Sequence, residues 1–312
     1  MANIVTLTPN PAIDVSTAVD RVVPMLKLRC TTQRRDPGGG GINVARVVKR
    51  FGGDVEAILP AGGATGDMLR RLIEDEGVPN RIVPVEAATR EDFSVTELST
   101  DTQYRFVLPG QPLREAEWRA CLSALAATAP APRLVVGSGS LPPGVPSDFY
   151  AQAAAIAAKL GARFFLDTSG PALAAAIEHG VGLIKPNLNE MRQLIGAEFA
   201  DPAECIVAAR KIIRTGQVEI VALSLGHLGA LLITREEVLR ASPLLIQAKS
   251  SVGAGDSFLG AMVFSIAKGD SLVDAFRLGV AAGAAALINE GTELCPAAEA
   301  YRLSAQVQIE SL

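Results

Sequence analysis

The chain contains few of the residues that metal and thiol enzymes use. Its 312 residues include two histidines and four cysteines. The cysteines form no CxxC pair, and the histidines do not have the spacing of metal ligands. A disulfide framework, a zinc site and a histidine-based catalytic triad are therefore not expected.

A strong charge imbalance and long apolar runs are also missing. Lys and Arg number 29 against 33 Asp and Glu, which gives a net charge of -4 without a long basic run. No uninterrupted apolar stretch reaches the ~18 residues of a membrane span, and the first residues do not follow a signal-peptide pattern. We therefore expect a cytoplasmic protein without a nucleic-acid or membrane partner.

What the chain does have is an alternation of short aliphatic runs with Ala-rich and Leu-rich segments at helical spacing. The aliphatic runs include "RLVVGSGS" from Arg133, "RFFLDTSG" from Arg163 and "EIVALSLG" from Glu219. This pattern predicts a single α/β domain over residues 1–312, with a doubly wound, mostly parallel sheet flanked by helices. Ligands of such sheets bind at the carboxyl ends of the strands, where these polar residues fall.

Two polar, Val- and Thr-rich segments interrupt this alternation. They predict a small β-sheet lid with strands from about 12–35 and 89–109. The alternative is that both are edge hairpins that extend the main sheet.

The stretch "PGGGGINVAR" from Pro37 places four glycines before a predicted helix. Its backbone can approach a ligand closely, and the free amides at the helix start suit an anion. Asn43, in the first turn, could hydrogen-bond a sugar hydroxyl. A dinucleotide site is disfavoured, because the GxGxxG fingerprint is absent.

A second glycine-rich turn, "SVGAGDSF" from Ser251, places Asp256 at the start of an apolar helix. One interpretation is a simple helix cap. The other is phosphoryl transfer to an alcohol, in which the amides stabilise the transferring group and the carboxylate accepts the hydroxyl proton. A Walker GxxxxGK[ST] motif, the common alternative route to this chemistry, is absent.

Two further strand ends carry polar residues. In "KPNLNE" from Lys185, Asn187 and Glu190 offer hard oxygen ligands that suit Mg²⁺, although the same pattern is also a helix start. The segment "SLGHLGA" from Ser224 is a further glycine-containing turn that could face an adenine or a phosphate.

Several of these motifs together resemble a known family. "GGGGINVAR", "GSLPPGV", "KPNLNE", "SLGHLGA", "VGAGDS" and "AAGAAA…NEGT" have the order and spacing of the PfkB-type sugar kinases of the ribokinase-like fold. The resemblance covers almost the whole chain and implies an ATP- and Mg²⁺-dependent kinase. It implies that Asp256 is the catalytic base and that the anion hole is formed by Gly253, Ala254 and Gly255.

The same resemblance implies further site residues. It assigns Mg²⁺ to Asn187 and Glu190, and the ATP site to Lys185, Asn187, Ser224, Gly226 and Gly229. It also implies a monovalent-cation loop, for K⁺, at Ser250, Val252, Ala286, Asn289 and Gly291.

The acceptor is predicted from the lid. Lys27, Arg29, Arg90 and Arg105 are long cations on its candidate strands, and charge-assisted contacts of this kind hold a phosphate. By resemblance to the phosphosugar members, we expect Lys27, Arg90 and Arg105 to hold the substrate phosphate. The sugar itself would be held by Asp14, Gly39, Asn43 and Ser140. Without the resemblance, ordinary solvated edge charges would be the favoured interpretation.

The phosphosugar members include 6-phosphofructokinases of the minor bacterial type, 1-phosphofructokinases and tagatose-6-phosphate kinases. The chain resembles the first most closely, since Gly40 stands where 1-phosphofructokinases usually carry lysine. The opening "NPAID" is closer to the other two, and Glu293 replaces a usually basic residue. We therefore expect a 6-phosphofructokinase, acting as a homodimer that packs its lids through residues such as Val95 and Phe106. A non-catalytic sugar- or nucleotide-binding relative is the alternative from a different class.

Overall fold

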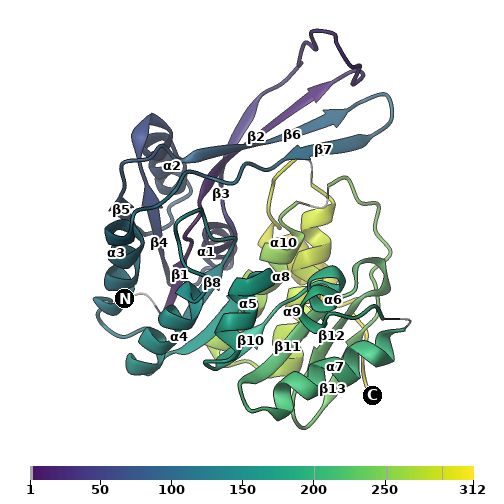
Figure 1. Ribbon diagram of the computed structural model, residues 1–312. Coiled ribbons are helices and arrows are strands. Elements are labelled where there is room, and N and C mark those ends of the chain that lie inside the picture. Colours follow the sequence, from purple (N-terminus) through teal and green to yellow (C-terminus); the bar gives the residue numbers. More distant parts are fainter. Residues whose placement is uncertain (1–2, 200, 251, 290) are drawn as a thin grey trace.

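A computed structural model describes residues 3–199, 201–250, 252–289 and 291–312, and Figure 1 shows its two sheets. Of the motif residues, Ser251 and Glu290 lie outside this part. The main sheet is mostly parallel and is extended at one edge by antiparallel strands. In spatial order its described strands are β5 (Asn80–Pro84), β4 (Val55–Ala61), β1 (Ile4–Leu7), β8 (Leu134–Ser138), β9 (Arg163–Asp167), β10 (Val181–Ile184), β11 (Val218–Ser224), β12 (Ala230–Ile233), β13 (Val238–Ala241) and β14 (Ile309–Ser311).

Helices cover both faces of this sheet because its strands are apolar on both sides. On β1, for example, Ile4 packs into one core and Val5 into the other. The first core is covered by α1 (Gly40–Arg50), α2 (Gly63–Asp75), α8 (Ala254–Lys268), α9 (Leu272–Leu287) and α10 (Ala297–Ser304). The second is covered by α3 (Glu115–Ala126), α4 (Phe149–Lys159), α5 (Gly170–Ile177), α6 (Leu188–Ile195) and α7 (Pro202–Arg214). The predicted fold class is confirmed.

A separate small sheet projects from this body in Figure 1. Its described strands, in order, are β3 (Arg34–Gly38), β2 (Ala12–Val19), β6 (Arg90–Glu97) and β7 (Thr102–Phe106). The predicted lid range 12–35 therefore contains β2 at its start and the beginning of β3 at its end. Residues 20–33 between them contain no strand, since Pro24 lacks a ladder donor and Met25 has a left-handed φ of 65°. Because β3 runs directly into the glycine run, the small sheet is joined to the site without a linker.

The carboxyl ends of the parallel strands meet at one edge of the main sheet. Asp167 ends β9, Lys185 follows β10, Ser224 ends β11 and Ser138 ends β8. The glycine-rich starts of α1 and α8 carry further polar residues, and the contacts below join them to this edge. Within the described residues, no helix combines the length and apolar character needed to cross a membrane.

Candidate active site

The start of α8 is open and glycine-rich. Gly253, its N-cap, has a left-handed φ of 74°, and no side chain caps the helix. A Cβ at Gly253 would lie 2.6 Å from Leu294 Cδ2, so the turn is also packed closely. The amides at this helix start are therefore left for a ligand, as the anion-hole prediction for Gly253, Ala254 and Gly255 requires.

Asp256 lies in the first turn of α8, where it is partly buried. Burial, with added repulsion from Asp167, raises its pKa to about 6 from an ordinary 3.8. Asn43 donates from Nδ2 to Asp256 Oδ2 at 2.9 Å, and this hydrogen bond limits the rise in pKa. The carboxylate is thus ionised at neutral pH but basic enough to accept a proton.

A second acid, Asp14 on β2, faces the same region. Burial raises its pKa to about 6, helped by the negative charges of Asp92 and Asp256. Arg105 on β7 lowers the pKa of both Asp14 and Asp256. The structure therefore brings together one predicted cation and two predicted acids that are far apart in sequence.

The glycine run beside Asp14 is sterically required. Gly39 has φ 108°, and a Cβ there would lie 2.8 Å from Thr8 Cγ2. At Gly40 a Cβ would lie 2.1 Å from Ser138 Oγ, so a side chain at that position would require Ser138 to move. At Gly38 a Cβ would meet the Asp14 carboxylate at 2.6 Å. The turn is therefore as close to its neighbours as a backbone without side chains permits.

Lys185 is a buried cation next to the α8 turn. Its Nζ pairs with Asp167 Oδ2 at 3.2 Å, and a Cβ at Gly255 would lie 3.2 Å from that Nζ. Burial lowers the pKa of Lys185, but the nearby carboxylates outweigh burial and raise the pKa above its ordinary value. The ammonium therefore stays charged beside the open amides. Asp167 was not predicted from the sequence, although its position at the end of a parallel strand was a usable signal.

Asn187 and Glu190 form a reciprocal cap at the start of α6. Asn187 N donates to Glu190 Oε2 at 2.8 Å, and Glu190 N donates to Asn187 Oδ1 at 2.9 Å. The helix-start interpretation is therefore confirmed. Burial and the negative charge of Asp167 raise the pKa of Glu190, while Lys185 lowers it. The Glu190 carboxylate therefore interacts electrostatically with both members of the Lys185–Asp167 ion pair. These hard oxygen donors fit Mg²⁺ bound mainly through phosphates. No cluster of three acidic, His or Cys ligands occurs among the described residues.

The predicted nucleotide turn follows β11. Ser224 forms an isolated bridge with Asn187, which joins the two strand ends. Gly226 has φ 61° and faces open space, whereas a Cβ at Gly229 would lie 2.1 Å from Ala241 O. Gly226 is thus free to face a ligand, and Gly229 is required by close backbone packing.

Arg90, on β6, is held near the glycine run. It contacts Asp92 Oδ2 at 3.2 Å, donates to the carbonyls of Leu108 and Asn10, and is mostly buried. Its Nε is buried and has no hydrogen-bond partner in the described structure. Asn10 also donates from Nδ2 to Ser140 Oγ at 3.1 Å, which links two predicted substrate residues through one that the sequence did not indicate.

Lys27 and Arg29 have a different position. Both are exposed on the strandless segment 20–33, and no contact recorded for the described residues joins either side chain to Arg90 or Arg105. The predicted cation cluster is therefore brought together only in part within one chain.

The predicted monovalent-cation loop is assembled from three segments. Ser250 Oγ donates to Gly291 O at 2.7 Å and accepts from Val252 N at 3.2 Å. Asn289 N donates to Ala286 O at 3.2 Å, which closes the end of α9. Carbonyl and hydroxyl oxygens therefore gather directly before the α8 turn, and this donor set fits a K⁺ ion.

The small sheet is hydrogen-bonded to this loop. Thr292 Oγ1 donates to Asp36 Oδ2 at 2.8 Å, and Ser16 Oγ lies 3.3 Å from Thr292 Oγ1. Because Thr292 has only one hydroxyl proton, Ser16 is the donor in the second contact. Glu293 pairs with Arg34 at 3.1 Å, so the acid at this position has a partner on β3.

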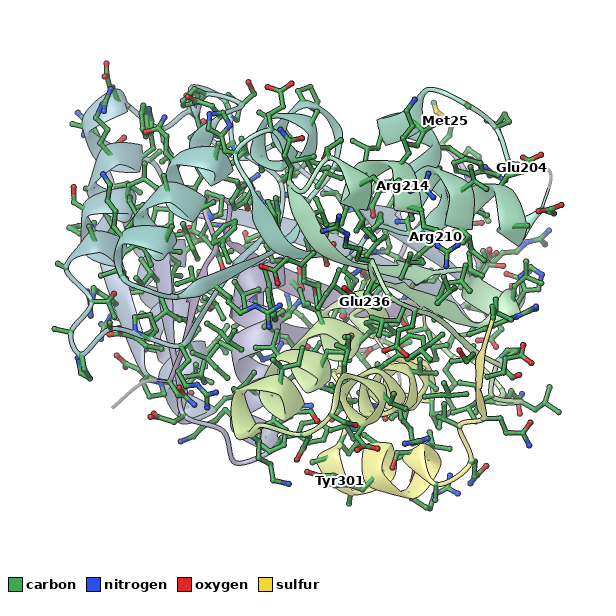
Figure 2. The ribbon with its side chains drawn as sticks, turned by 90° about the horizontal axis from the view of Figure 1, so that it is seen from below. Met25, Glu204, Arg210, Arg214, Glu236 and Tyr301 are labelled. Carbon is green, nitrogen blue, oxygen red and sulfur yellow. The ribbon has the colours of Figure 1, made fainter. Side chains whose placement is uncertain are left out.

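Hollow volume alone does not identify this site. A hollow of about 480 Å³ is lined by Arg210, Arg214, Ile213, Thr234 and Arg235, and Figure 2 shows the first two on α7. It lies where β11 begins and β12 ends, at the edge of the sheet opposite the acids. The carboxyl edge combines ionisable acids, a buried lysine and open amides, whereas the described lining of the hollow has none of these three.

Comparison with known proteins agrees with this geometry. The family model for pfkB family carbohydrate kinases matches residues 7–299. The ATP-dependent 6-phosphofructokinase isozyme 2 of Mycobacterium tuberculosis is 48% identical over 94% of this chain and 86% of its own. The crystal structure of Escherichia coli phosphofructokinase-2 with potassium matches with a TM-score of 0.93 and 41% identity, over 98% and 99% of the two chains. The tetrameric inhibited form of the same enzyme matches with a TM-score of 0.92 and 40% identity over the same shares. The chain therefore belongs to the pfkB family of carbohydrate kinases.

Proposed function

We propose that the chain is an ATP-dependent 6-phosphofructokinase. It transfers the γ-phosphoryl group of Mg·ATP to the C1 hydroxyl of fructose 6-phosphate and releases fructose 1,6-bisphosphate and ADP. The C1 oxygen forms a bond to the γ-phosphorus, the bond from that phosphorus to the β,γ-bridging oxygen breaks, and the hydroxyl proton leaves the sugar. The observation that carries the proposal is Asp256, an ionised acid with a raised pKa beside an uncapped helix start.

In this mechanism Asp256 accepts the C1 hydroxyl proton. A base with a pKa of about 6 is mostly ionised at neutral pH and still holds a proton well enough to assist its removal. The hydrogen bond from Asn43 aims one carboxylate oxygen and leaves the other oxygen for the sugar.

Charge on the transferring group is stabilised by the amides of the Gly253–Gly255 turn and by Lys185. Asn187 and Glu190 would hold Mg²⁺, which when bound neutralises charge on the phosphates of ATP. Ser224, Gly226 and Gly229 would line the nucleotide site. Ser250, Val252, Ala286, Asn289 and Gly291 would hold K⁺ and so fix the backbone of the turn.

The phosphosugar would bind between the small sheet, which we propose is a lid, and the glycine run. Arg90 has an unpaired buried Nε, and Arg105 acts on both acids, so both are suited to the 6-phosphate. Asp14, Gly39, Asn43 and Ser140 would contact the sugar, while Lys27 and Arg29 add positive charge from the exposed segment. The close approach of Ser138 to Gly40 also favours this member of the family over those with lysine there.

We further propose a homodimer that forms through the lids. One face of the small sheet leaves large apolar side chains exposed, among them Phe93, Tyr104 and Phe106. An isolated small sheet with an exposed apolar face is marginal in water, and pairing with a second copy would cover it. Sedimentation of the purified chain would test this, and a monomer at all concentrations would contradict it.

The test of function is coupled ADP release with Mg·ATP. Fructose 6-phosphate, fructose 1-phosphate, tagatose 6-phosphate and unphosphorylated fructose are compared by kcat/KM. We expect a clear preference for fructose 6-phosphate. A preference for fructose 1-phosphate or tagatose 6-phosphate would show that this sugar, and not fructose 6-phosphate, is the substrate. A preference for free fructose would show that the lid cations do not bind a substrate phosphate. Tight sugar or nucleotide binding without ADP release would indicate a non-catalytic relative.

A further inference from the structure

Arg46 is the most deeply buried cation among the described residues, with 1% of its surface exposed. It lies on α1, three residues after Asn43. Nothing in the proposed chemistry uses it directly, because its guanidinium faces the protein and not the open turn. A buried guanidinium is retained only where its donors are satisfied, so its partners indicate its role.

Each of the three side-chain nitrogens of Arg46 has at least one hydrogen-bond partner. Nη1 donates to Asn43 Oδ1 at 3.0 Å and to Pro37 O at 2.9 Å. Nε donates to both oxygens of Glu76 at 2.9 Å, and Nη2 also pairs with Glu76. Nη2 lies 4.0 Å from Asp36 Oδ1 as well. Arg46 thus joins α1 to β3 of the small sheet and to the end of α2.

The contact between Arg46 and Asn43 determines which end of the Asn43 amide faces Asp256, the proposed catalytic base. A guanidinium can only donate, so the amide oxygen of Asn43 must face Arg46. The amide nitrogen must then face Asp256, to which it donates at 2.9 Å. Rotating the amide by half a turn would set two donors against each other at Arg46 and two acceptors against each other at Asp256.

We propose that Arg46 is a positioning residue for the reaction: it holds the Asn43 amide in the one orientation that donates to Asp256, and it ties that orientation to strand β3 of the small sheet. This inference deepens the proposed function, on which it rests for the role of Asp256. The connection continues through Asp36 to Thr292, which lies in the loop between α9 and α10.

The test variant is Arg46→Lys, which keeps a positive charge for Glu76. An ammonium at that position cannot donate at once to Glu76, Pro37 and Asn43 in the fixed geometry of a guanidinium. The matched control is Arg50→Lys. Arg50 lies one turn later on the same helix and pairs with the same Glu76 at 3.6 Å, but it does not contact Asn43. Thermal unfolding checks that both variants fold.

The first readout is the titration of the Asp256 carboxyl, followed by ¹³C NMR and assigned by its loss in Asp256→Asn. The groups that act on this carboxyl are Asp14 on β2, Arg105 on β7, Asp167 on β9, Lys185 after β10 and Asn43 on α1. Since a hydrogen bond to a carboxylate lowers its pKa, we expect Arg46→Lys to move the midpoint about one pH unit upward. Arg50→Lys should leave it unchanged. An unmoved midpoint in Arg46→Lys, or an equal shift in both variants, overturns the proposal.

The second readout separates positioning from general support. If Arg46 acts through Asn43, then Arg46→Lys should lower kcat about tenfold in the wild-type background and change nothing further in an Asn43→Ala background. Effects of the two substitutions that add in the double variant would contradict the proposal. If Arg46→Lys fails to fold, Glu76→Gln loosens the guanidinium and should shift the titration upward by a smaller amount; no shift there is again a contradiction.

Failure of this inference and failure of the proposed function give different results. The carboxyl titration needs no turnover, so it tests Arg46 even if none of the four sugars is phosphorylated. Conversely, a fully active 6-phosphofructokinase whose Asp256 titrates identically with and without Arg46 would keep the function and remove the positioning role.

Discussion

The starts of α8 and α6 face the same buried lysine, but they satisfy their backbone amides in opposite ways. At α6, Asn187 and Glu190 cap each other's amides at 2.9 and 2.8 Å. At α8, Gly253 offers no side chain, and the first acid, Asp256, hydrogen-bonds Asn43 and not its own helix. The difference teaches that a helix start becomes an anion site only where its own side chains leave the amides open.

The largest difference between the two helix starts should appear on removing the acid of α8. Asp256→Asn keeps the size of the side chain but cannot accept the hydroxyl proton. We expect the fold to persist and kcat to fall by ~10² or more. Steady-state ADP release with unfolding curves in parallel checks this. Near-normal turnover in the variant would return Asp256 to the role of a helix residue.

The raised pKa of Asp256 should also make the free energy of unfolding depend on pH. Its folded pKa of about 6 lies above the ordinary 3.8, so its stabilising effect is present below pH 3.8 and is lost as the pH rises through 6. Asp256→Asn should therefore raise the free energy of unfolding at pH 8 by up to about 3 kcal/mol, with little gain at pH 3.5. Denaturant titrations at both pH values measure this. Glu236→Gln, at an exposed acid, is the surface control, and a pH-independent gain in Asp256→Asn would contradict the assignment.

Backbone geometry at the open start is tested by Gly253→Ala. A left-handed φ costs an alanine ~1–2 kcal/mol, and its Cβ would press against Leu294. We expect a lower Tm together with a roughly tenfold loss of kcat as the amides move. Gly269→Ala is the matched control, because Gly269 ends the same helix with φ 93° and faces open space. Equal losses of kcat in the two variants would show that helix strain alone is responsible.

The smallest effect should come from a substitution at the capped start of α6. Asn187→Ala removes a cap and should cost ~1 kcal/mol of stability. If Asn187 also helps to hold Mg·ATP, KM for Mg·ATP should rise. Asp201→Ala is the control, since Asp201 caps α7 through Ala203 N at 2.6 Å, away from the site. If KM for Mg·ATP is unchanged in both variants, Asn187 has only its structural role as a helix cap.

Much of the site could be predicted from the sequence because its parts are local. The glycine turns, the helix that each precedes and the polar residues at strand ends are set by φ preferences and by the alternation of apolar runs. The position of β3 could not be predicted in the same way. Residues 20–33 have the composition of a strand, but Pro24 and the backbone of Met25 end the ladder, and pairing resumes at Arg34.

The sequence by itself determined the α/β fold class, the two glycine-rich helix starts and the acid in the first turn of α8. Only the tertiary structure decided which side chains meet there. Asp167 pairs with Lys185, and Asn10 hydrogen-bonds Ser140, which lies 130 residues away in the chain. Arg46 acts on Asp256 through Asn43, whose hydrogen bond to Asp256 spans 213 residues. Short-range patterns encode backbone conformation, whereas the pKa of Asp256 depends on burial and on charges delivered by other elements.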